Sequence, residues 1–375
     1  MSDPHPVADP DASHVRVCVI GGGQAGLATG FYLRRAGLVP GVDFVILDAA
    51  EQPGGAWAQM WPSLRTFSPT RYSSLPGWMM PTWTEDSGYP LAAHVADYLS
   101  AYERRYELAV RRPVRVAGVS RADQGLLVRT DHGNWLADQV VSATGTWSRP
   151  FIPTYPGQFA GQQLHTAQYR QAADFSGRRV LVVGGGNSAA QILAEVSRVA
   201  DTTWVTPRPP RFLPDDVDGH ALFQLATNRR RAHDSGHPDT GGVAGLGDIV
   251  MVDSVRDARD RGVLHARDPF ERLTRSGVRW TNGDHVELDV IIWCTGFRPA
   301  LHHLAPLRLR GPAGLIPTHG TQAVQEPRLH LVGYGDWTGP ASATLIGVGR
   351  TARDLATALT QSSAQFPIRR ESRGA

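Results

Sequence analysis

Two glycine-rich turns of the same type decide what this chain can fold into. The first reads Gly21-Gly22-Gly23-Gln24-Ala25-Gly26 and the second reads Gly184-Gly185-Gly186-Asn187-Ser188-Ala189. Each follows an apolar run, 15–20 or 180–183, and opens a helical pattern, 24–36 or 188–200. Strand, glycine turn and helix in that order are typical of a dinucleotide-binding Rossmann unit. One such turn is a weak signal, but two in one chain predict an α/β protein with two Rossmann-like domains.

Each turn is expected to hold the pyrophosphate of one dinucleotide. Its glycines permit a tight turn and a close approach of the backbone, and the free N–H groups at the positive end of the helix bind the anion. The expected contacts are Gly21, Gly23, Gln24, Ala25 and Gly26 at the first turn, and Gly184, Gly186, Asn187, Ser188 and Ala189 at the second.

The residue that ends the next strand indicates which dinucleotide the first turn binds. The apolar strand 44–47 ends in Asp48, 22 residues past Gly26. A carboxylate there accepts hydrogen bonds from the ribose hydroxyls and repels a 2′-phosphate. The first site is therefore predicted to take an unphosphorylated adenosine.

The second turn lacks such a carboxylate. The strand 203–206 is followed by Pro207-Arg208-Pro209-Pro210-Arg211. The guanidinium groups of Arg208 and Arg211 can each fork onto a phosphate, which favours NADPH over NADH. The alternative is that both arginines are solvated surface charges, because arginine is common throughout this chain.

Composition narrows the function further. The chain has 375 residues, enough for two ordinary domains, and its net charge of +3 is spread out, so we expect no nucleic-acid partner. No apolar run approaches the roughly 18 residues needed to span a bilayer, and residues 1–14 lack the apolar core of a signal peptide, so a cytoplasmic location without membrane attachment is expected. Lysine is absent, which argues against Schiff-base chemistry.

The two cysteines argue against one class of flavoprotein. Flavin-dependent disulfide reductases use a pair of nearby redox cysteines, commonly Cys-x-x-Cys. Cys18 and Cys294 stand alone inside apolar runs. Each is predicted to be a core residue beside a cofactor turn; a disulfide between them stays open on sequence alone but disagrees with a reducing cytoplasm.

The remaining patterns predict the order of the domains. They indicate a helix over 91–106, meander strands over 114–119 and 126–129, buried strands over 140–145, 290–294 and 329–332, and a helix over 341–359. Prolines at 150, 153 and 156 suggest a hinge. We expect a flexible N-terminus over 1–14, a first domain from 15–152 and 297–365, an inserted second domain over 153–296, and a flexible tail over 366–375.

Several motifs together carry a family resemblance. The segment Phe159-x-Gly161-x-x-x-His165-x-x-x-Tyr169 fits the fingerprint FxGxxxHxxx(Y/F) and lies between the two glycine turns. The other matching pieces are Gly54-Gly55-Ala56-Trp57, Ala143-Thr144-Gly145, Cys294-Thr295-Gly296-Phe297 and Gly335-Asp336. Over nearly its whole length the chain resembles the class B flavoprotein monooxygenases, in particular their flavin-containing branch. The run from Trp61 through Ser68-Pro69 to Leu75-Pro76-Gly77 is similar to flavin monooxygenases of arsenic-resistance operons.

The resemblance implies FAD at the first turn and NADPH at the second. It adds Trp57, Ala143, Thr144, Gly145, Thr295 and Gly296 to the expected cofactor-binding residues, puts the backbone of Val116 on the adenine, and has Gly335 and Asp336 hold the ribityl-phosphate region of the flavin. The N-terminus of the last helix would face the isoalloxazine and stabilise the negative charge of reduced flavin. Taken alone, Gly335-Asp336 is only a turn signal, and His165 is expected to couple the domains rather than to act as an acid or base.

One departure from the family pattern leaves the activity open. Flavin-containing monooxygenases carry an asparagine near the flavin, whereas the comparable segment 64–69 reads Leu-Arg-Thr-Phe-Ser-Pro. The favoured interpretation is an NADPH-dependent FAD monooxygenase that transfers one oxygen atom from O2 to a small molecule with a soft nucleophilic centre: nitrogen, sulfur or trivalent arsenic. The alternatives are an NADPH-dependent flavin reductase that passes electrons to a partner, and a non-oxygenating redox sensor. No metal is expected, no catalytic side chain is assigned, and the oligomeric state is left open.

Overall fold

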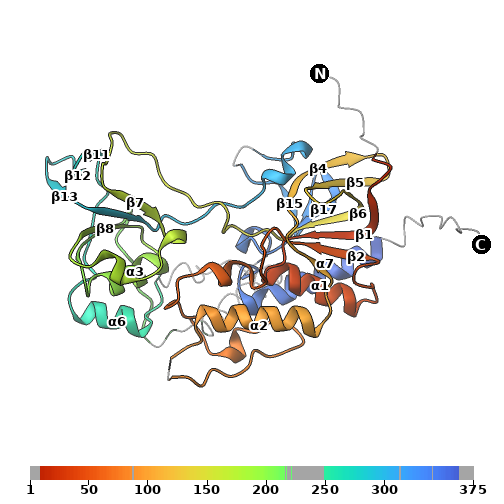
Figure 1. Ribbon diagram of the computed structural model, residues 1–375, viewed down its shortest axis with the longest axis horizontal. Coiled ribbons are helices and arrows are strands. Elements are labelled where there is room, and N and C mark those ends of the chain that lie inside the picture. Colours follow the sequence, from red (N-terminus) through yellow and green to blue (C-terminus); the bar gives the residue numbers. More distant parts are fainter. Residues whose placement is uncertain are drawn as a thin grey trace, which may run out of the picture.

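The chain folds around two separate β-sheets, each with its own helices (Figure 1). The computed structural model describes residues 9–86, 88–215, 217, 221, 249–311, 314–339 and 341–362. The first sheet takes strands from both ends of the chain, and the second takes its strands from the middle. Both described ends of the chain therefore lie on the same side of the molecule.

The first sheet is parallel over most of its width. Its order is β15-β16-β17-β6-β1-β2-β3, with β5 paired to β6 and β4 paired to β5. The five strands from β17 to β3 are parallel, β15, β16, β4 and β5 pair antiparallel, and β2, whose sequence is Phe-Val-Ile-Leu, is buried along its whole length. The bounds are β1 Ser13–Ile20, β2 Phe44–Leu47, β3 Val110–Arg111, β4 Val116–Ala122, β5 Gly125–Thr130, β6 Trp135–Ser142, β15 Thr318–His319, β16 Gln322–Ala323 and β17 Glu326–Leu331.

Three helices cover this sheet: α1 Gln24–Arg35, α2 Ala92–Arg105 and α7 Leu345–Ser362. Their apolar faces share one core with the strands, in which Leu27, Leu99 and Val348 are fully buried. The apolar spacing that predicted α1 and α2 is the spacing that places these side chains on one face.

The second sheet is parallel throughout, in the order β10-β9-β8-β14-β7. Its strands are β7 Gln162–His165, β8 Arg179–Val183, β9 Asp201–Val205, β10 Ala266–Arg267 and β14 Val290–Trp293, with helices α3 Asn187–Val196 and α6 Asp253–Asp260. A small antiparallel sheet is formed by β11 Arg272–Thr274, β12 Gly277–Arg279 and β13 His285–Glu287. Short 3-10 helices complete the described chain: Gly55–Gln59, Thr70–Tyr72, Thr166–Gln168, Ala172–Phe175, His302–Leu307 and Gly335–Trp337.

The two crossings between the sheets run side by side. Pro150 and Phe297 form an antiparallel bridge, the Phe151 N–H donates to Gly296 O over 3.0 Å, and the Arg298 N–H donates to Arg149 O over 2.8 Å. Trp147 stacks on Phe297 with ring centroids 5.1 Å apart. The inserted domain thus leaves and returns through a two-stranded ribbon.

The domains also share an apolar core. Trp61, Leu64 and Ala92 belong to the part of the chain that builds the first domain, yet they pack in one cluster with Ile192 and Val196 of α3. Because Trp61 is only 2% exposed, the segment that carries it is wedged against the second domain.

Most predicted elements are present, with shifted ends. Strand β1 begins at Ser13, inside the segment expected to be flexible, because Ser13 and His14 pair with the start of β6. The last helix begins at Leu345 rather than at residue 341, because the preceding residues form hydrogen-bonded turns such as Ser342 N–H to Gly339 O, 2.9 Å. Residues 1–8 and 363–375, which include the predicted tail, lie outside the described residues. Within the described ranges, no helix is long and apolar enough to cross a membrane.

Candidate dinucleotide-binding sites

The two glycine turns are built in the same way. Gly21 follows β1 at φ +110°, and a Cβ there would lie 2.5 Å from the carbonyl oxygen of Ala143, which follows β6. Gly184 follows β8 at φ +140°, and a Cβ there would lie 2.2 Å from the carbonyl oxygen of Cys294, which follows β14. Both positions exclude side chains by clash and by backbone conformation. Each glycine turn is therefore pressed against an x-Thr-Gly turn, Ala143-Thr144-Gly145 or Cys294-Thr295-Gly296, at the carboxyl edge of its sheet.

The space beyond these turns suits a pyrophosphate. A Cβ at Gly186, Gly145, Gly296 or Gly335 would meet no atom within 4 Å. Gly23 and Gly186, directly before helices α1 and α3, make no side-chain cap hydrogen bond. Backbone N–H groups at a helix N-terminus, with open space beside them, are the features that bind phosphate.

Asp48, the predicted ribose-binding residue, is held by two hydrogen bonds at the end of β2. Its Oδ2 accepts a 2.9 Å bond from Arg112 Nε, and its Oδ1 accepts a 3.3 Å bond from the N–H of Ala50. Arg112 also donates to Glu103 Oε1 over 2.7 Å, and its side chain is only 9% exposed. Burial alone lowers the pKa of Arg112, but the bond to Glu103 and the two carboxylate charges raise it overall. Each Asp48 oxygen keeps a lone pair for a hydroxyl donor.

Sequence reasoning missed Arg112 and Glu103. No motif marks them, because they lie far from Asp48 in the chain and meet it only after α2 and β3 fold against β2. The backbone beside them is fixed as well, since the Val114 N–H donates to Asp48 O over 2.8 Å. This bond brings the stretch leading to Val116, the predicted adenine contact, next to Asp48.

Gln24 joins three segments around the first turn. Its Oε1 accepts from Trp57 Nε1 over 2.9 Å, and its Nε2 donates to Ala343 O over 2.6 Å. The Gly-Gly-x-Trp segment and the turns before α7 are thereby attached to the start of α1.

A chain of buried polar groups supports the Ala-Thr-Gly turn of the first site. Thr144 Oγ1 donates to Ala300 O over 2.8 Å, and Tyr334 Oη lies 2.7 Å from both Thr144 Oγ1 and Ser142 Oγ. Ser142 Oγ lies 3.1 Å from His303 Nε2. Each hydroxyl has one proton, and Ala300 O can only accept, so the donors run from His303 through Ser142, Tyr334 and Thr144. His303 is then the neutral Nε2–H tautomer.

The lowered pKa of His303 agrees with this assignment. Burial, with a smaller effect from His302, lowers the pKa of His303 to about 3. Tyr334 lies directly before Gly335 and Asp336, so the same network orients the turn expected to hold the flavin ribityl phosphate. The Asp336 side chain itself is exposed.

At the second turn Asn187 holds a distant segment. Its Oδ1 accepts from the Val250 N–H over 2.8 Å, while Ser188 is half-buried beside it and Ala189 is buried. Next to Val250, the Ile249 N–H donates to Arg211 O over 3.1 Å. The glycine turn is thus connected to the loop that carries the predicted phosphate-binding arginines through one side-chain and one backbone hydrogen bond. Arg208 and Arg211 are both exposed.

The fingerprint histidine holds the second x-Thr-Gly turn. His165 is 1% exposed; its Nδ1 accepts from the Ala167 N–H over 3.2 Å, and its Nε2 lies 3.0 Å from Gly296 O. A carbonyl can only accept, so Nε2 carries the proton. Burial lowers the pKa of His165, with partial compensation from the bond to Gly296. Both ring nitrogens are used structurally, as expected for a coupling residue. Beside Gly296, the hydroxyl of Thr295 donates to Phe151 O on the other crossing.

The fingerprint tyrosine reaches across the domain boundary. Tyr169 is fully buried, and its ring packs edge-on against Trp61 with centroids 5.9 Å apart. Its hydroxyl donates to Glu195 Oε2 over 2.7 Å, and Glu195 Oε1 accepts from Ser63 Oγ over 2.7 Å. Glu195 lies on α3, the helix that the second glycine turn opens. Sequence reasoning missed Glu195 and Ser63, because a single carboxylate on a helix gives no signal of a partner in another domain.

Neither cysteine is poised for thiol chemistry. Cys18 lies in β1 and Cys294 at the end of β14, in different sheets, and both are free and buried. Burial raises the pKa of both thiols, that of Cys294 to about 12. The prediction of two separate core cysteines is confirmed, and the open possibility of a disulfide between them is excluded.

Known proteins match this arrangement over most of the chain. A model of the family described as "Pyridine nucleotide-disulphide oxidoreductase" matches residues 18–218. A solved flavin-containing monooxygenase from Stenotrophomonas maltophilia is 48% identical, with 93% of this chain and 99% of that one covered and a TM-score of 0.83. A double variant of a flavin monooxygenase from that organism is 49% identical, with the same coverage and a TM-score of 0.84. An indole-3-pyruvate monooxygenase, YUCCA1 of Oryza sativa subsp. japonica, is 28% identical, covering 84% of this chain and 86% of its own.

Proposed function

Because the chain belongs to the pyridine nucleotide-disulphide oxidoreductase family, and within it to the flavin-containing monooxygenases, we propose that it oxygenates small molecules at a soft nucleophilic centre. It is an FAD- and NADPH-dependent oxidoreductase and has the predicted α/β fold with an inserted second Rossmann-like domain. The finer proposal concerns the atom that is oxidised: nitrogen, sulfur or trivalent arsenic.

The observation that carries the proposal is the state of the two cysteines. Disulfide reductases pass electrons from flavin to a nearby redox thiol pair. Here the thiols lie in different sheets, and burial raises the pKa of both. Electrons from NADPH therefore have no thiol acceptor in this chain, which favours O2 as the acceptor.

The residues of the first site fit FAD and those of the second fit NADPH. We assign the FAD pyrophosphate to the turn after β1, its ribose to Asp48 and its ribityl phosphate to the turn at Asp336. We assign the NADPH pyrophosphate to the turn after β8 and its 2′-phosphate to Arg208 and Arg211. Bound flavin would supply the hydride acceptor and the activation of O2; the side chains bind, orient and exclude water.

A soft nucleophile fits the absence of an acid–base pair. Among the described residues around the two turns, His165 is neutral with both nitrogens engaged, and His303 is buried with its pKa lowered to about 3. An amine, thioether, thiol or trivalent arsenical presents a lone pair without deprotonation by the enzyme. The chemistry thus needs no general base from this chain, unlike reactions that must first remove a proton from carbon.

The test is oxygen incorporation from labelled O2. Purified holoenzyme is incubated with NADPH, 18O2 and each of a tertiary amine, a thioether and a trivalent methylarsenical. One labelled oxygen in the product of at least one class, with NADPH consumption matched to product, is expected. Stoichiometric hydrogen peroxide with every class would overturn the proposal and favour a flavin reductase, which fast reduction of a protein acceptor would then identify.

A further inference from the structure

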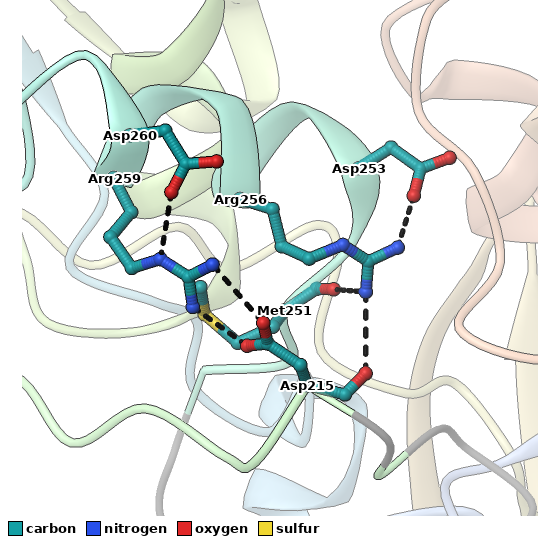
Figure 2. Close-up of polar contacts among 6 residues, drawn as sticks. All are labelled: Asp215, Met251, Asp253, Arg256, Arg259 and Asp260. Atoms are coloured by element: carbon teal, nitrogen blue, oxygen red, sulfur yellow. Dashed lines mark hydrogen bonds and ion pairs between the residues drawn. The ribbon is translucent and has the colours of Figure 1, made fainter.

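A loop and a helix of the second domain are held together by a cluster of charged side chains that no part of the proposed reaction uses (Figure 2). The loop runs from Pro207 to Asp215 and carries Arg208 and Arg211. The helix is α6. Any role of this cluster in cofactor selection rests on the proposed 2′-phosphate contact of these two arginines.

Backbone hydrogen bonds hold the loop directly before its first residue and at its middle. Before Pro207, the Thr206 N–H donates to Arg267 O of β10 over 3.1 Å. In its middle, Phe212 forms a parallel bridge with Ile249, and the Leu213 N–H donates to Ile249 O over 2.9 Å. Four prolines, at 207, 209, 210 and 214, restrict its backbone further.

The distal end of the loop is held by two arginines of α6. Arg259 forks onto the Asp215 carboxylate, with Nη1 2.7 Å from Oδ1 and Nη2 3.1 Å from Oδ2. Arg256 donates from Nη1 to the Asp215 carbonyl over 3.3 Å and to Met251 O over 2.6 Å. Each arginine also pairs with a carboxylate on α6, Asp253 for Arg256 and Asp260 for Arg259 (Figure 2). Arg259 lowers the pKa of Asp215, which is therefore ionised at neutral pH.

Helix α6 is a firm support for this cluster. Its apolar face, with Val255 and Ala258, is fully buried. Its C-terminal end is also bound to α3 and the residues after it, because Arg261, directly after α6, donates to Ala194 O over 3.0 Å and Arg198 pairs with Asp257 over 2.7 Å. The helix that would receive the NADPH pyrophosphate and the loop that would receive its 2′-phosphate are thus connected through α6.

We infer that the Asp215–Arg259 pair is a positioning device for NADPH selection. It fixes the distal end of the loop relative to α3, so that Arg208 and Arg211 are held at the distance from the glycine turn that the adenosine 2′-phosphate requires. Neither Asp215 nor Arg259 touches the cofactor in this proposal. Their loss raises the entropic cost of ordering the loop around a phosphate, and a ligand without the 2′-phosphate does not bear that cost.

The test compares two ligands that differ only by the 2′-phosphate, adenosine 2′,5′-bisphosphate and 5′-AMP. Calorimetry on the FAD-loaded protein measures both dissociation constants without turnover. For Asp215→Asn the expected result is about fivefold weaker binding of the bisphosphate, the range of an exposed ion pair, with AMP unchanged. Arg259→Gln is expected to do the same, and the double variant to be no weaker than either single one.

Two reference variants make the result interpretable. Asp289→Asn removes a comparable exposed ion pair in the same domain, with Arg179 Nη2 2.9 Å from Oδ1 and Nε 3.2 Å from Oδ2. It is expected to leave the dissociation constants of both ligands unchanged.

Arg208→Ala tests the proposed phosphate contact itself. If Arg208→Ala weakens only the bisphosphate while Asp215→Asn and Arg259→Gln change nothing, the positioning role is wrong and the phosphate site stands. Equal loss of both ligands in the Asp215 and Arg259 variants would also overturn it. If Arg208→Ala and Arg211→Ala leave both ligands unchanged, the phosphate assignment fails and the positioning role falls with it.

Discussion

The Tyr169 hydroxyl lies 2.7 Å from Glu195 Oε2, and this hydrogen bond joins the fingerprint motif to the helix of the second glycine turn. The other oxygen of the same carboxylate accepts from Ser63, in a segment that packs beside the first domain's helix α2. One carboxylate therefore sets the position of α3 relative to both the fingerprint and the first domain. Hydride transfer depends on that relative position.

Removing the Tyr169 hydroxyl should slow flavin reduction more than it weakens NADPH binding. Tyr169→Phe keeps the ring against Trp61 but deletes the donor to Glu195, so α3 loses one fixed point. We expect the limiting rate of anaerobic flavin reduction to fall about tenfold, since small misplacements of reacting groups are costly. The dissociation constant of NADPH should stay within about twofold of the parent value. Tyr155→Phe, a stacked tyrosine in another cluster, is the control. A large rise in the dissociation constant at an unchanged limiting rate would contradict the positioning role.

Replacing Asp48 should release FAD without unfolding the domain. In Asp48→Ala two ribose hydroxyls lose a charged acceptor worth on the order of 1.5–3 kcal/mol, while Arg112 keeps its bond to Glu103. Dialysed protein is expected to lose most of its FAD, measured from the flavin absorbance per protein. Glu103→Gln, which leaves Asp48 in place, should retain it. Full flavin content in Asp48→Ala would show that the carboxylate does not hold the ribose.

Both thiols should be unreactive in the folded protein. Cys18 is 0% and Cys294 9% exposed, and burial raises the pKa of each well above its ordinary value, so neither thiol ionises at pH 8. A chromogenic disulfide reagent at pH 8 is expected to label neither native thiol and both after denaturation. Cys294→Ala and Cys18→Ala, made separately, should each keep the rate of flavin reduction by NADPH within about twofold of the parent rate. Rapid labelling of either thiol during turnover would contradict this prediction and support a thiol mechanism.

Stability should fall in mild acid because of buried histidines. Burial lowers the pKa of His303 to about 3 and that of His330 to about 4. Below pH 6.5 the unfolded chain takes up these protons and the folded chain does not. Each histidine therefore lowers the free energy of unfolding by about 1.4 kcal/mol per pH unit as the pH falls from 6.5 towards its folded-state pKa.

His303→Gln isolates one of these contributions. The glutamine amide can still donate to Ser142 but does not titrate. Denaturant unfolding at pH 8, 6.5 and 5 is expected to give a shallower loss of stability below pH 6.5 than the parent shows. Parallel curves for the two proteins would mean that His303 is already protonated in the fold.

The sequence could predict the elements that are determined by their own residues and immediate neighbours in the chain. The turn at Gly21 follows from the tight strand-to-helix geometry, and helix α2 from apolar spacing along its own residues. Strands β11 to β13 were not predicted, because with three residues each they are too short to show a period. Strand β7 was missed because Gln162 and Gln163 are exposed at an edge.

The candidate site divides in the same way. Asp48 follows a strand at a known interval, so its place could be predicted, whereas Arg112 and Glu195 act through partners 64 residues and 26 residues away. The predicted cofactor contacts and domain bounds stay predictions. The hydrogen bonds of Arg112 and Glu195 depend on tertiary packing, which cannot be read from the spacing of residues in the sequence.

The paired crossings at Pro150 and Phe297 also restrict how the two domains can move. A single linker would let the inserted domain swivel freely about its bonds. Two antiparallel segments that are hydrogen-bonded to each other and joined by the Trp147–Phe297 stack must move together. Rotation of the inserted domain about either segment alone would break these contacts, so the paired crossings restrain the orientation of one dinucleotide site relative to the other.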